Sequence, residues 1–293
     1  MARTSFCLLR SICSGWVSGA ELCMEYNLLE PYRDVQHHQI ISGIIRDFSS
    51  NDRTPGEVLL DGLDLHNARA VLDLGCGFGY MTESLARRVA RNACITGIDA
   101  CETNDLSFTG AVSRTGRCSR FICDAIDRTL PFDNCSFDVV LSSYSLYFFV
   151  EAIADIARVL REDGCFIAIS HNMELIDALI DITGLSHSRA VLTNIFGSFC
   201  GENAVSLLAP HFSHVEEVTY RNRLCFRKEN IRALMTYVEH KLPFLLPGTF
   251  HSQGVEHDVL EAVPAYFEAH GEVVIQKDDC CFRCTGPRRR APR

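Results

Sequence analysis

Residues 71–79 constrain the fold of this chain more than any other stretch. They read Val-Leu-Asp-Leu-Gly-Cys-Gly-Phe-Gly, an apolar run that ends near an acid and leads into three alternate glycines. A helical pattern begins near Tyr80. Glycine permits a positive φ and lets a ligand approach the backbone, because it has no Cβ. The stretch therefore predicts a buried parallel strand, a tight turn beside a ligand site, and a helix.

The spacing of the glycines separates two kinds of nucleotide site. G-x-G-x-G differs from the G-x-G-x-x-G fingerprint of pyrophosphate sites in NAD enzymes. The pattern D-x-G-x-G-x-G instead resembles the first motif of class I S-adenosylmethionine-dependent methyltransferases. The resemblance implies S-adenosyl-L-methionine as cofactor and S-adenosyl-L-homocysteine as its product. The residues that it places at the cofactor here are Asp73, Gly75, Cys76, Gly77 and Gly79.

Two further acids stand at strand ends. The runs 94–99 and 121–125 are short and apolar, and they carry Asp99 and Asp124. Asp99 follows Asp73 at the spacing of one strand–helix–strand unit, where a carboxylate can accept two hydrogen bonds from ribose hydroxyls. Asp124 is placed to accept from the adenine amino group. A single Asp at such a place is more commonly a helix cap or a solvated strand end. Three acids at successive strand ends, in the order that matches the family, favour an adenosine site.

The resemblance extends over residues 68–172. Residues 137–143 and 165–170 read as the fourth and fifth strands, with a helix over 152–161 and a turn at 162–164 between them. By family match, Ala100, Ala125 and Ser142 join the implied cofactor site. The implied fold class is α/β: a doubly wound, mostly parallel seven-stranded sheet of the Rossmann-like methyltransferase type.

The second half of the chain reads as a cap. Strands are expected at 214–220 and 272–285, with helices over 228–242, stopped by Pro243, and over 255–270, kinked or divided by Pro264. This layout resembles a group of class I methyltransferases that act on small molecules. The resemblance implies cap helices from about 172–200 and 228–270. We expect one methyltransferase domain over 26–286, an extension over 1–25 and a basic tail over 287–293.

Composition limits the partners and the location. The chain has 293 residues and a net charge of −9, which disfavours a nucleic-acid partner. No apolar stretch approaches the ~20 residues of a membrane span. The first 20 residues carry Arg3 and Arg10 but no acid, which is typical of a floppy extension or of an organellar address. We expect these residues to be a floppy extension rather than an organellar address, and we expect the protein to be cytoplasmic.

The cysteines point to packing rather than to a metal. There are fifteen, and the C-x-x-C run from Cys281 to Cys284 lacks the second pair that structural zinc needs. Cys280, Phe282 and Cys284 alternate, as one face of a strand would. We therefore expect core or surface thiols and no metal site.

The histidines of the chain are candidates for a catalytic base. Methyl transfer from a sulfonium is an in-line displacement, and a hydroxyl or carbon-acid acceptor also needs a base. His171 directly follows the fifth strand, at the rim where ligands bind, and is the candidate base. His37 and His38 lie in an N-terminal helical pattern that family members fold over the cofactor. For any single histidine a structural or surface role is the commoner one.

The end of the fourth strand bears on the acceptor. Enzymes that methylate nucleobase amino groups show Asn or Asp, Pro-Pro and an aromatic residue here, but this chain has Ser142-Ser143-Tyr144. We expect a small-molecule acceptor. An RNA or protein acceptor and an inactive methyltransferase-like subunit remain as alternatives. The sequence leaves open the methylated atom and the oligomeric state.

Overall fold

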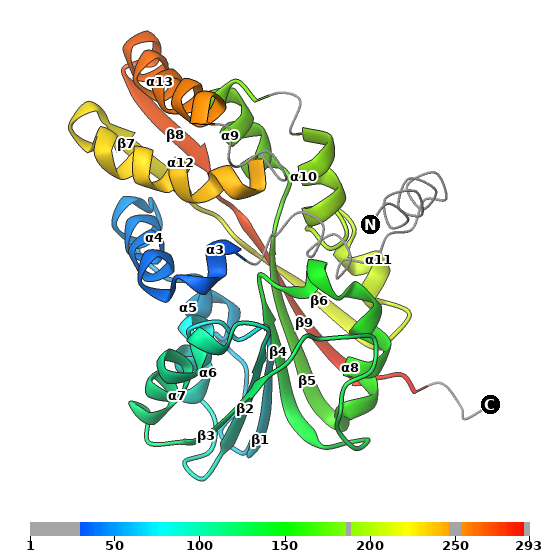
Figure 1. Cartoon of the computed structure of the whole chain (residues 1–293). Coiled ribbons are helices and arrows are strands. Elements are labelled where there is room, and N and C mark those ends of the chain that lie inside the picture. Colours follow the sequence, from blue (N-terminus) through cyan, green and yellow to red (C-terminus); the bar gives the residue numbers. More distant parts are fainter. Residues whose placement is uncertain (1–29, 186–188, 246–252, 290–293) are drawn as a thin grey trace, which may run out of the picture.

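A seven-stranded sheet forms the centre of the protein (Figure 1). The computed structural model describes residues 30–185, 189–245 and 253–289. The strand order is β3-β2-β1-β4-β5-β9-β6. The strands are β1 (Ala70–Leu74), β2 (Cys94–Asp99), β3 (Cys118–Cys123), β4 (Phe137–Ser143), β5 (Leu160–His171), β6 (Phe212–Tyr220) and β9 (Asp279–Pro287). The first five pair in parallel, and β9 runs antiparallel between β5 and β6. The predicted doubly wound, mostly parallel sheet is confirmed.

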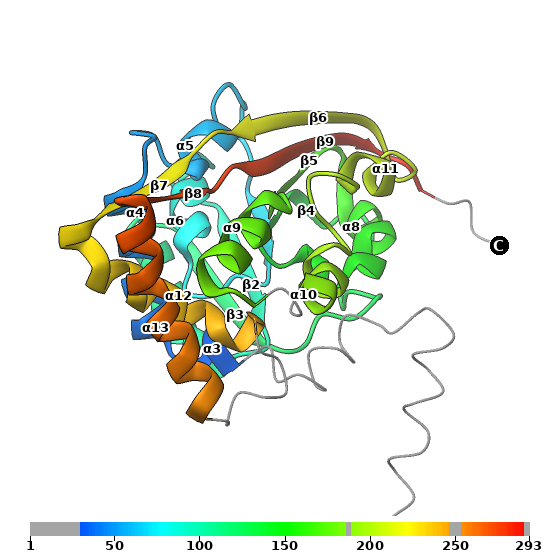
Figure 2. The same cartoon turned by 90° about the horizontal axis from the view of Figure 1, so that it is seen from above.

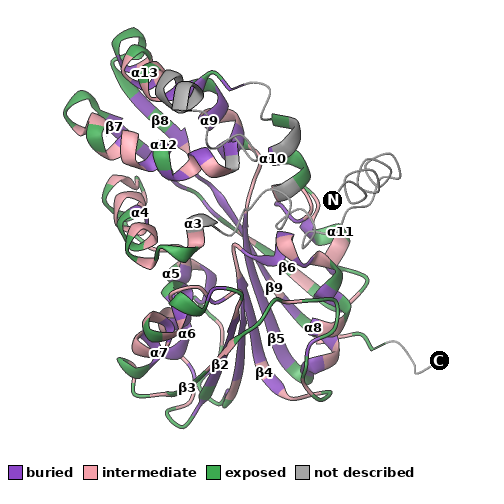
Figure 3. Ribbon diagram, viewed as in Figure 1, coloured by how far each residue is buried: buried purple, intermediate pink, exposed green. Residues whose placement is uncertain are grey.

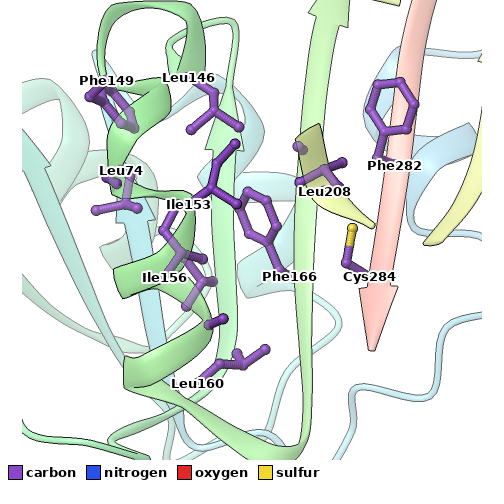
Figure 4. Close-up of a cluster of buried hydrophobic side chains, with 14 of the residues drawn as sticks. Leu74, Leu146, Phe149, Ile153, Ile156, Leu160, Phe166, Leu208, Phe282 and Cys284 are labelled. Carbon is purple, nitrogen blue, oxygen red and sulfur yellow. The ribbon is translucent and has the colours of Figure 1, made fainter. Parts of the chain in front are cut away.

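Helices cover both faces of this sheet (Figure 1). On one face lie α5 (Pro55–Leu59), α6 (Tyr80–Ala86) and α7 (Asp105–Ser113), and on the other α8 (Ile153–Val159) and α11 (Ala204–Leu208). Successive side chains of a strand point to opposite faces of the sheet. Val71 therefore packs in a first apolar cluster, with α5, α6 and α7, and Leu72 packs in a second, with α8 and α11. Figure 4 shows part of the second cluster, where Phe166 packs near Ile153 and Ile156 of α8.

A second layer covers the carboxyl ends of the parallel strands (Figure 2). It consists of α3 (Glu30–Arg33), α4 (Val35–Phe48), α9 (Glu174–Thr183), α10 (Arg189–Phe196), α12 (Ile231–Leu245), α13 (Gln253–His270) and a ribbon of β7 (Arg223–Arg227) and β8 (Glu272–Gln276). The layer has its own apolar cluster, which includes Leu179, Phe226 and Val263. Figure 3 shows buried residues along the central strands and also in α9 and β8.

The expected single strand over 272–285 is wrong. β8 belongs to the two-stranded ribbon and β9 to the main sheet. Between them, Lys277 N–H donates to the Asn222 carbonyl at 3.0 Å, and Asn222 N–H donates to Asp278 Oδ1 at 2.7 Å. These bonds replace sheet pairing for the intervening residues, so the chain changes sheets there.

Three other boundaries also differ from expectation. The turn expected at 162–164 lies within β5, which begins at Leu160 and pairs with β4 through a register shift next to Phe137. α12 continues through Pro243 to Leu245 because a proline in the last turn removes little of the helix's hydrogen bonding. α13 passes through Pro264 undivided.

Two further expectations concern the ends of the chain and the membrane. The extension over 1–25 and the last four residues of the basic tail lie outside the described residues. Within the described ranges, no helix has the length and apolar character that crossing a membrane requires.

Candidate active site

Glycines shape the loop that follows β1. The N–H groups of Gly75 and Cys76 both donate to the Ile98 carbonyl, at 2.9 and 3.1 Å, which ties the loop to the end of β2. Gly75 and Gly77 have φ values of 68° and 50°, in the left-handed region that favours glycine. A Cβ on Gly75 would lie 2.5 Å from Ser145 Cβ, whereas a Cβ on Gly77 would meet nothing within 4 Å. Gly77 therefore leaves room for a ligand beside the backbone.

Asp99 joins this loop to the turn after β2. Its half-buried carboxylate accepts from the Gly77 N–H at 2.8 Å and the Cys101 N–H at 2.9 Å. Asn104 Nδ2 donates to it at 3.1 Å. The carboxylate borders the cavity described below, where its remaining acceptor positions can meet a ligand.

Asp73 is the most deeply buried of the predicted acids, with 1% exposure. Thr82 Oγ1 donates to its Oδ2 at 2.5 Å, while Oδ1 has no hydrogen-bond partner among the described residues. Burial raises the pKa of Asp73 to about 7, against the lowering effect of the Thr82 bond. A cationic ligand at Oδ1 would satisfy this oxygen and favour its charged form. The carboxylate oxygens beside this loop thus fit a cofactor that carries an ammonium and a sulfonium.

Two of the predicted cofactor residues, Ser142 and Gly79, are not among the residues that line the cavity described below, and their assignment stays a prediction. Ser142 is fully buried with its Oγ 2.9 Å from Ser145 Oγ, and Ser145 borders the cavity in its place. Gly79 begins α6 and faces α7, where a Cβ would lie 2.9 Å from Ala111 Cβ. The positive φ of Gly79 and this close approach are sufficient reasons for a glycine at this position, whether or not a ligand lies nearby.

One cavity of about 740 Å³ lies between the glycine loop and the helical layer. Its volume falls in the range of ~300–1,000 Å³ that is usual for small-molecule sites. The predicted residues that line it are Asp73, Gly75, Cys76, Gly77, Asp99, Ala100, Asp124, Ala125 and His171. The residues of its far wall come from α4, α12 and the β8–β9 break: His38, His240, Lys241, Lys277 and Asp279. Most of the predicted cofactor residues and the candidate base therefore line the same cavity.

Asp279, the first residue of β9, is fully buried at the centre of a polar cluster. Lys277 Nζ lies 2.8 Å from its Oδ1 and 2.9 Å from its Oδ2. The Tyr144 hydroxyl donates to Oδ2 at 2.8 Å, and His171 Nδ1 lies 3.0 Å from Oδ1. Although burial opposes ionisation, Lys277 and His171 hold the pKa of Asp279 below its usual value. Asp279 is therefore an anion.

His171 pairs with Asp279 across the β5–β9 ladder, and its side chain is 19% exposed. Burial, followed by the charge of Lys277, lowers the pKa of His171 to about 4, against the raising effect of Asp279. The ring is therefore neutral at physiological pH. When Nδ1–H donates to the carboxylate, Nε2 carries the lone pair that can accept a proton.

Tyr144 connects β4 to this cluster through an unusual backbone conformation. Its φ is 54°, which costs a bulky residue about 1–3 kcal/mol and is most common at functional sites. The ring stacks on His171 with centroids 4.6 Å apart. This conformation aims the hydroxyl at Asp279 and covers one face of the imidazole.

α4 and α12 bring three more titratable groups to the cavity. His38 lies edge-on to Phe78 of the glycine loop, with centroids 5.0 Å apart, and stacks on His240 at 5.8 Å. Burial lowers the pKa of His38 to about 4 and that of His240 to about 2. Burial, then repulsion from Lys277, lowers the pKa of Lys241 to about 8. Both histidines are neutral and Lys241 is mainly charged at neutral pH.

The sequence analysis missed Asp279, Lys277 and Lys241. The first two had a usable signal, because Lys277-Asp278-Asp279 interrupts an otherwise apolar run with three charges. Lys241 had none, since its place at the cavity depends on how α12 packs.

The cysteines of β9 are core residues, as expected. Cys280, Cys281 and Cys284 are all buried. Cys280, Phe282 and Cys284 contact the cluster on one face of the sheet, and Cys281 contacts the cluster on the other. Within the described ranges, no group of three His, Cys, Asp or Glu side chains could hold a metal ion.

Comparison with known proteins identifies the central part of the chain. Residues 71–164 match the family model described as a methyltransferase domain. The chain carries a class I S-adenosylmethionine-dependent methyltransferase domain. The matched residues run from β1 into β5 and include the glycine loop and all three cofactor-side acids.

Two curated relatives are similar to the methyltransferase domain. The uncharacterized methyltransferase YcgJ of Bacillus subtilis is 31% identical over 105 residues, which cover 34% of this chain and 40% of YcgJ. The aklanonic acid methyltransferase DauC of Streptomyces is 31% identical over 105 residues, covering 35% of this chain and 47% of DauC. The chain thus spans less than half the length of these relatives.

A solved structure shares the fold more widely. A methyltransferase from Geobacter sulfurreducens, solved with S-adenosyl-L-homocysteine, aligns with a TM-score of 0.52 and 18% identity. The alignment covers 86% of this chain and 98% of that one. S-adenosylmethionine is the cofactor of this domain family.

Proposed function

We propose that this chain transfers a methyl group from S-adenosylmethionine to a small-molecule acceptor, with His171 as general base. The observation that carries the proposal is the shared cavity, which joins the glycine loop to the buried His171–Asp279 pair. When bound, the cofactor supplies an electrophilic methyl group on a sulfonium. The chain's own residues must hold that group, position the acceptor and take up its proton.

At the cofactor end, the proposed roles are those that the resemblance implies. Asp99 accepts the ribose hydroxyls, Asp124 accepts from the adenine amino group, and the open oxygen of Asp73 accepts from the ammonium. The backbone of Gly75, Cys76 and Gly77 lies against the ligand, and Ala100 and Ala125 flank its adenosine. Support comes from the unpartnered Asp73 Oδ1 and the free space beside Gly77.

The base is a pair rather than a lone histidine. Asp279 fixes the ring through Nδ1 and stabilises the cation that forms when Nε2 accepts the acceptor's proton. Lys277 and Tyr144 bind the same carboxylate and hold it in place. A hydroxyl or carbon acid needs a base to remove its proton during the transfer, whereas an acceptor that is already ionised does not. The presence of the pair therefore favours a hydroxyl or carbon acid as the acceptor.

The enclosed setting of the pair supports a small acceptor over RNA or protein. Helices α4 and α12 both contribute lining residues over the strand ends. DauC, one of the similar proteins, is named for a small organic acid, aklanonic acid. The intact glycines and acids count against an inactive subunit.

Two measurements test this function. Calorimetry should show saturable binding of S-adenosyl-L-homocysteine to the purified chain. Cofactor with a labelled methyl group should then label a small-metabolite fraction, and leave RNA and protein fractions of the same extract unlabelled. Label in the RNA or protein fraction would overturn the small-molecule acceptor, and absence of cofactor binding would overturn the enzyme itself.

Replacing His171 tests the base. His171→Ala should lower the rate of label transfer at saturating cofactor by ~10²–10⁴ and leave the affinity for S-adenosyl-L-homocysteine unchanged. His66, which pairs with Asp64 on the surface, supplies a matched control: His66→Ala should change neither quantity. A near-normal rate in His171→Ala, with a pH profile set by the acceptor's own pKa, would rule out His171 as base.

A further inference from the structure

Two exposed cysteines lie side by side where strands β2 and β3 begin. Cys94 is the first residue of β2 and Cys118 is the first residue of β3, and the two are partners in the parallel pairing of these strands. The Cys94 thiol donates to Cys118 Sγ at 3.5 Å. Both cysteines are free of disulfide bonds, and neither residue lines the cavity. The chain therefore carries a dithiol on its surface that neither the core nor the methyl-transfer site accounts for.

The backbone holds these two residues at a separation that a disulfide can bridge. Neighbouring strands lie about 4.8 Å apart, and the Cα atoms of disulfide-bonded cysteines are roughly 4.4–6.8 Å apart. The sulfurs must approach from 3.5 Å to a bond length of about 2.05 Å. Because both side chains are exposed, rotation about χ1 can bring the sulfurs together without displacing a buried side chain. Cys94 and Cys118 can therefore be oxidised to an internal disulfide.

A link between these residues would join the edge strand of the sheet to its neighbour. β3 is the outermost strand on this side of the sheet, and β2 lies next to it (Figure 1). The 24 positions from Cys94 to Cys118 include α7 and the turn that carries Asp99 and Asn104. Closing a loop of this length restricts the unfolded chain more than the folded one, so the link would stabilise the fold. The pair stands at the amino ends of the parallel strands, whereas the cavity lies at their carboxyl ends.

We propose that Cys94 and Cys118 form a reversible modification site that reacts with a low-molecular-weight disulfide such as oxidised glutathione. A thiolate of the pair attacks one sulfur of the small disulfide, whose S–S bond breaks and releases a first small thiol. The other cysteine then attacks the mixed disulfide formed on its neighbour, and a second small thiol leaves. Two protein thiols are oxidised to one disulfide, the small disulfide is reduced to two thiols, and the two protons of the pair pass to the leaving sulfurs. An excess of the small thiol drives the exchange backwards and restores the dithiol.

The surroundings of Cys94 set the conditions for this exchange. Partial burial, then the hydrogen bond and the charge of Cys118, raise the pKa of Cys94, and the charge of Arg120 lowers it by less. The Cys94 thiol is therefore protonated at neutral pH. Because the thiolate is the nucleophile, the exchange is faster in mildly alkaline solution.

Peptide mapping by mass spectrometry on the purified full chain tests this site. After treatment with oxidised glutathione at mildly alkaline pH, the map should contain two peptides that are linked through Cys94 and Cys118. The linked protein should melt about 5 °C or more above the reduced protein, and dithiothreitol should abolish this difference. A stable glutathione adduct on either cysteine, or free thiols at both after the treatment, would overturn the proposal.

Single substitutions show whether the two cysteines act as a pair. Cys94→Ser and Cys118→Ser should each abolish the linked peptides and the rise in melting temperature, and the cysteine that remains should keep a glutathione adduct instead. Cys225→Ser, at an exposed cysteine of β7, is the matched control and should behave as the wild type. A rise in melting temperature that persists in both single variants would show that other thiols cause it, which would contradict the role of this pair.

Discussion

Two carboxylates near the strand ends make structural contacts and also border the cavity. Asp99 holds the glycine loop and the following turn through three hydrogen bonds and still borders the cavity. Asp73 Oδ2 accepts from Thr82, whereas Oδ1 has no hydrogen-bond partner in the part of the chain that the structure describes. At this scale, the residues that shape the glycine loop are also ones that a ligand in the cavity could contact.

Replacing Asp99 should weaken cofactor binding. Asp99→Asn and Asp99→Ala remove charge-assisted contacts worth about 2–3 kcal/mol, which corresponds to a loss of roughly 30–150-fold in affinity for S-adenosyl-L-homocysteine by calorimetry. Thermal stability without ligand should also fall, because the loop contacts are lost. Asp163→Asn, at an exposed acid in β5, is the matched control. Unchanged affinity in both Asp99 variants would exclude a ribose contact.

Asp73 should make the stability of the unliganded protein depend on pH. Its pKa rises from 3.8 to about 7 on folding, so the folded protein holds this proton more tightly than the unfolded chain. The stabilisation is complete below about pH 4 and is lost as pH rises through 7. Relative to the wild type, Asp73→Asn should gain about 2–3 kcal/mol of unfolding free energy between pH 5 and pH 8.

Urea unfolding at several pH values measures this difference. A constant offset between the wild type and Asp73→Asn across the range would show that Asp73 is ionised throughout. The same substitution should weaken S-adenosyl-L-homocysteine binding, because the amide cannot balance an ammonium.

At the scale of elements, close approach between β2 and α7 fixes the wall behind the glycine loop. A Cβ on Gly97 would lie 2.5 Å from Phe108 Cζ and 2.7 Å from Cys76 Sγ. Gly97→Ala should therefore overpack this contact and cost about 1–3 kcal/mol of unfolding free energy. Gly110→Ala, in α7 with its nearest neighbour 3.7 Å away, should be neutral or stabilising by up to about 1 kcal/mol. Equal stabilities in urea would contradict this packing.

The break between β8 and β9 brings two charged residues to the cavity. Lys277 and Asp279 lie on either side of Asp278, where the chain passes from the ribbon to the main sheet. Side chains two residues apart in an extended chain point to the same side, so Lys277 and Asp279 can face one another while Asp278 points away. Lys277 Nζ and His171 Nδ1 both contact Asp279 there, while Asp278 accepts from the Asn222 N–H.

At the scale of the whole molecule, ligand contacts should couple the sheet to the layer above it. The cavity takes its lining from the strand ends and from α4 and α12, and His38 of α4 already packs against Phe78. S-adenosyl-L-homocysteine should therefore slow amide hydrogen exchange in residues 35–48 and 231–245. Exchange in α8, which contributes no lining residue, is the internal control. Equal exchange in all three segments with and without ligand would contradict the coupling.

The sequence by itself determined the methyltransferase sheet, and it predicted most of the residues that line the cavity beside the glycine loop. Glycines with positive φ and acids at the ends of parallel strands are local features, and parallel strands bring their carboxyl ends to one edge, so a linear pattern predicts a shared site. A local pattern does not specify which way each residue faces in the folded protein. Ser142 and Gly79 fit the pattern, but side-chain direction along a strand and helix contact turned them away from the cavity.

Only the tertiary structure decided which residues line the other side of the cavity. His171 could be found from its place after β5, but Asp279 becomes its partner through antiparallel pairing with a strand more than one hundred positions later in the chain. Lys241 reaches the same space because α12 packs across the strand ends. Contacts between segments so far apart depend on how layers pack, and packing of apolar faces leaves no residue spacing that a sequence pattern can reveal.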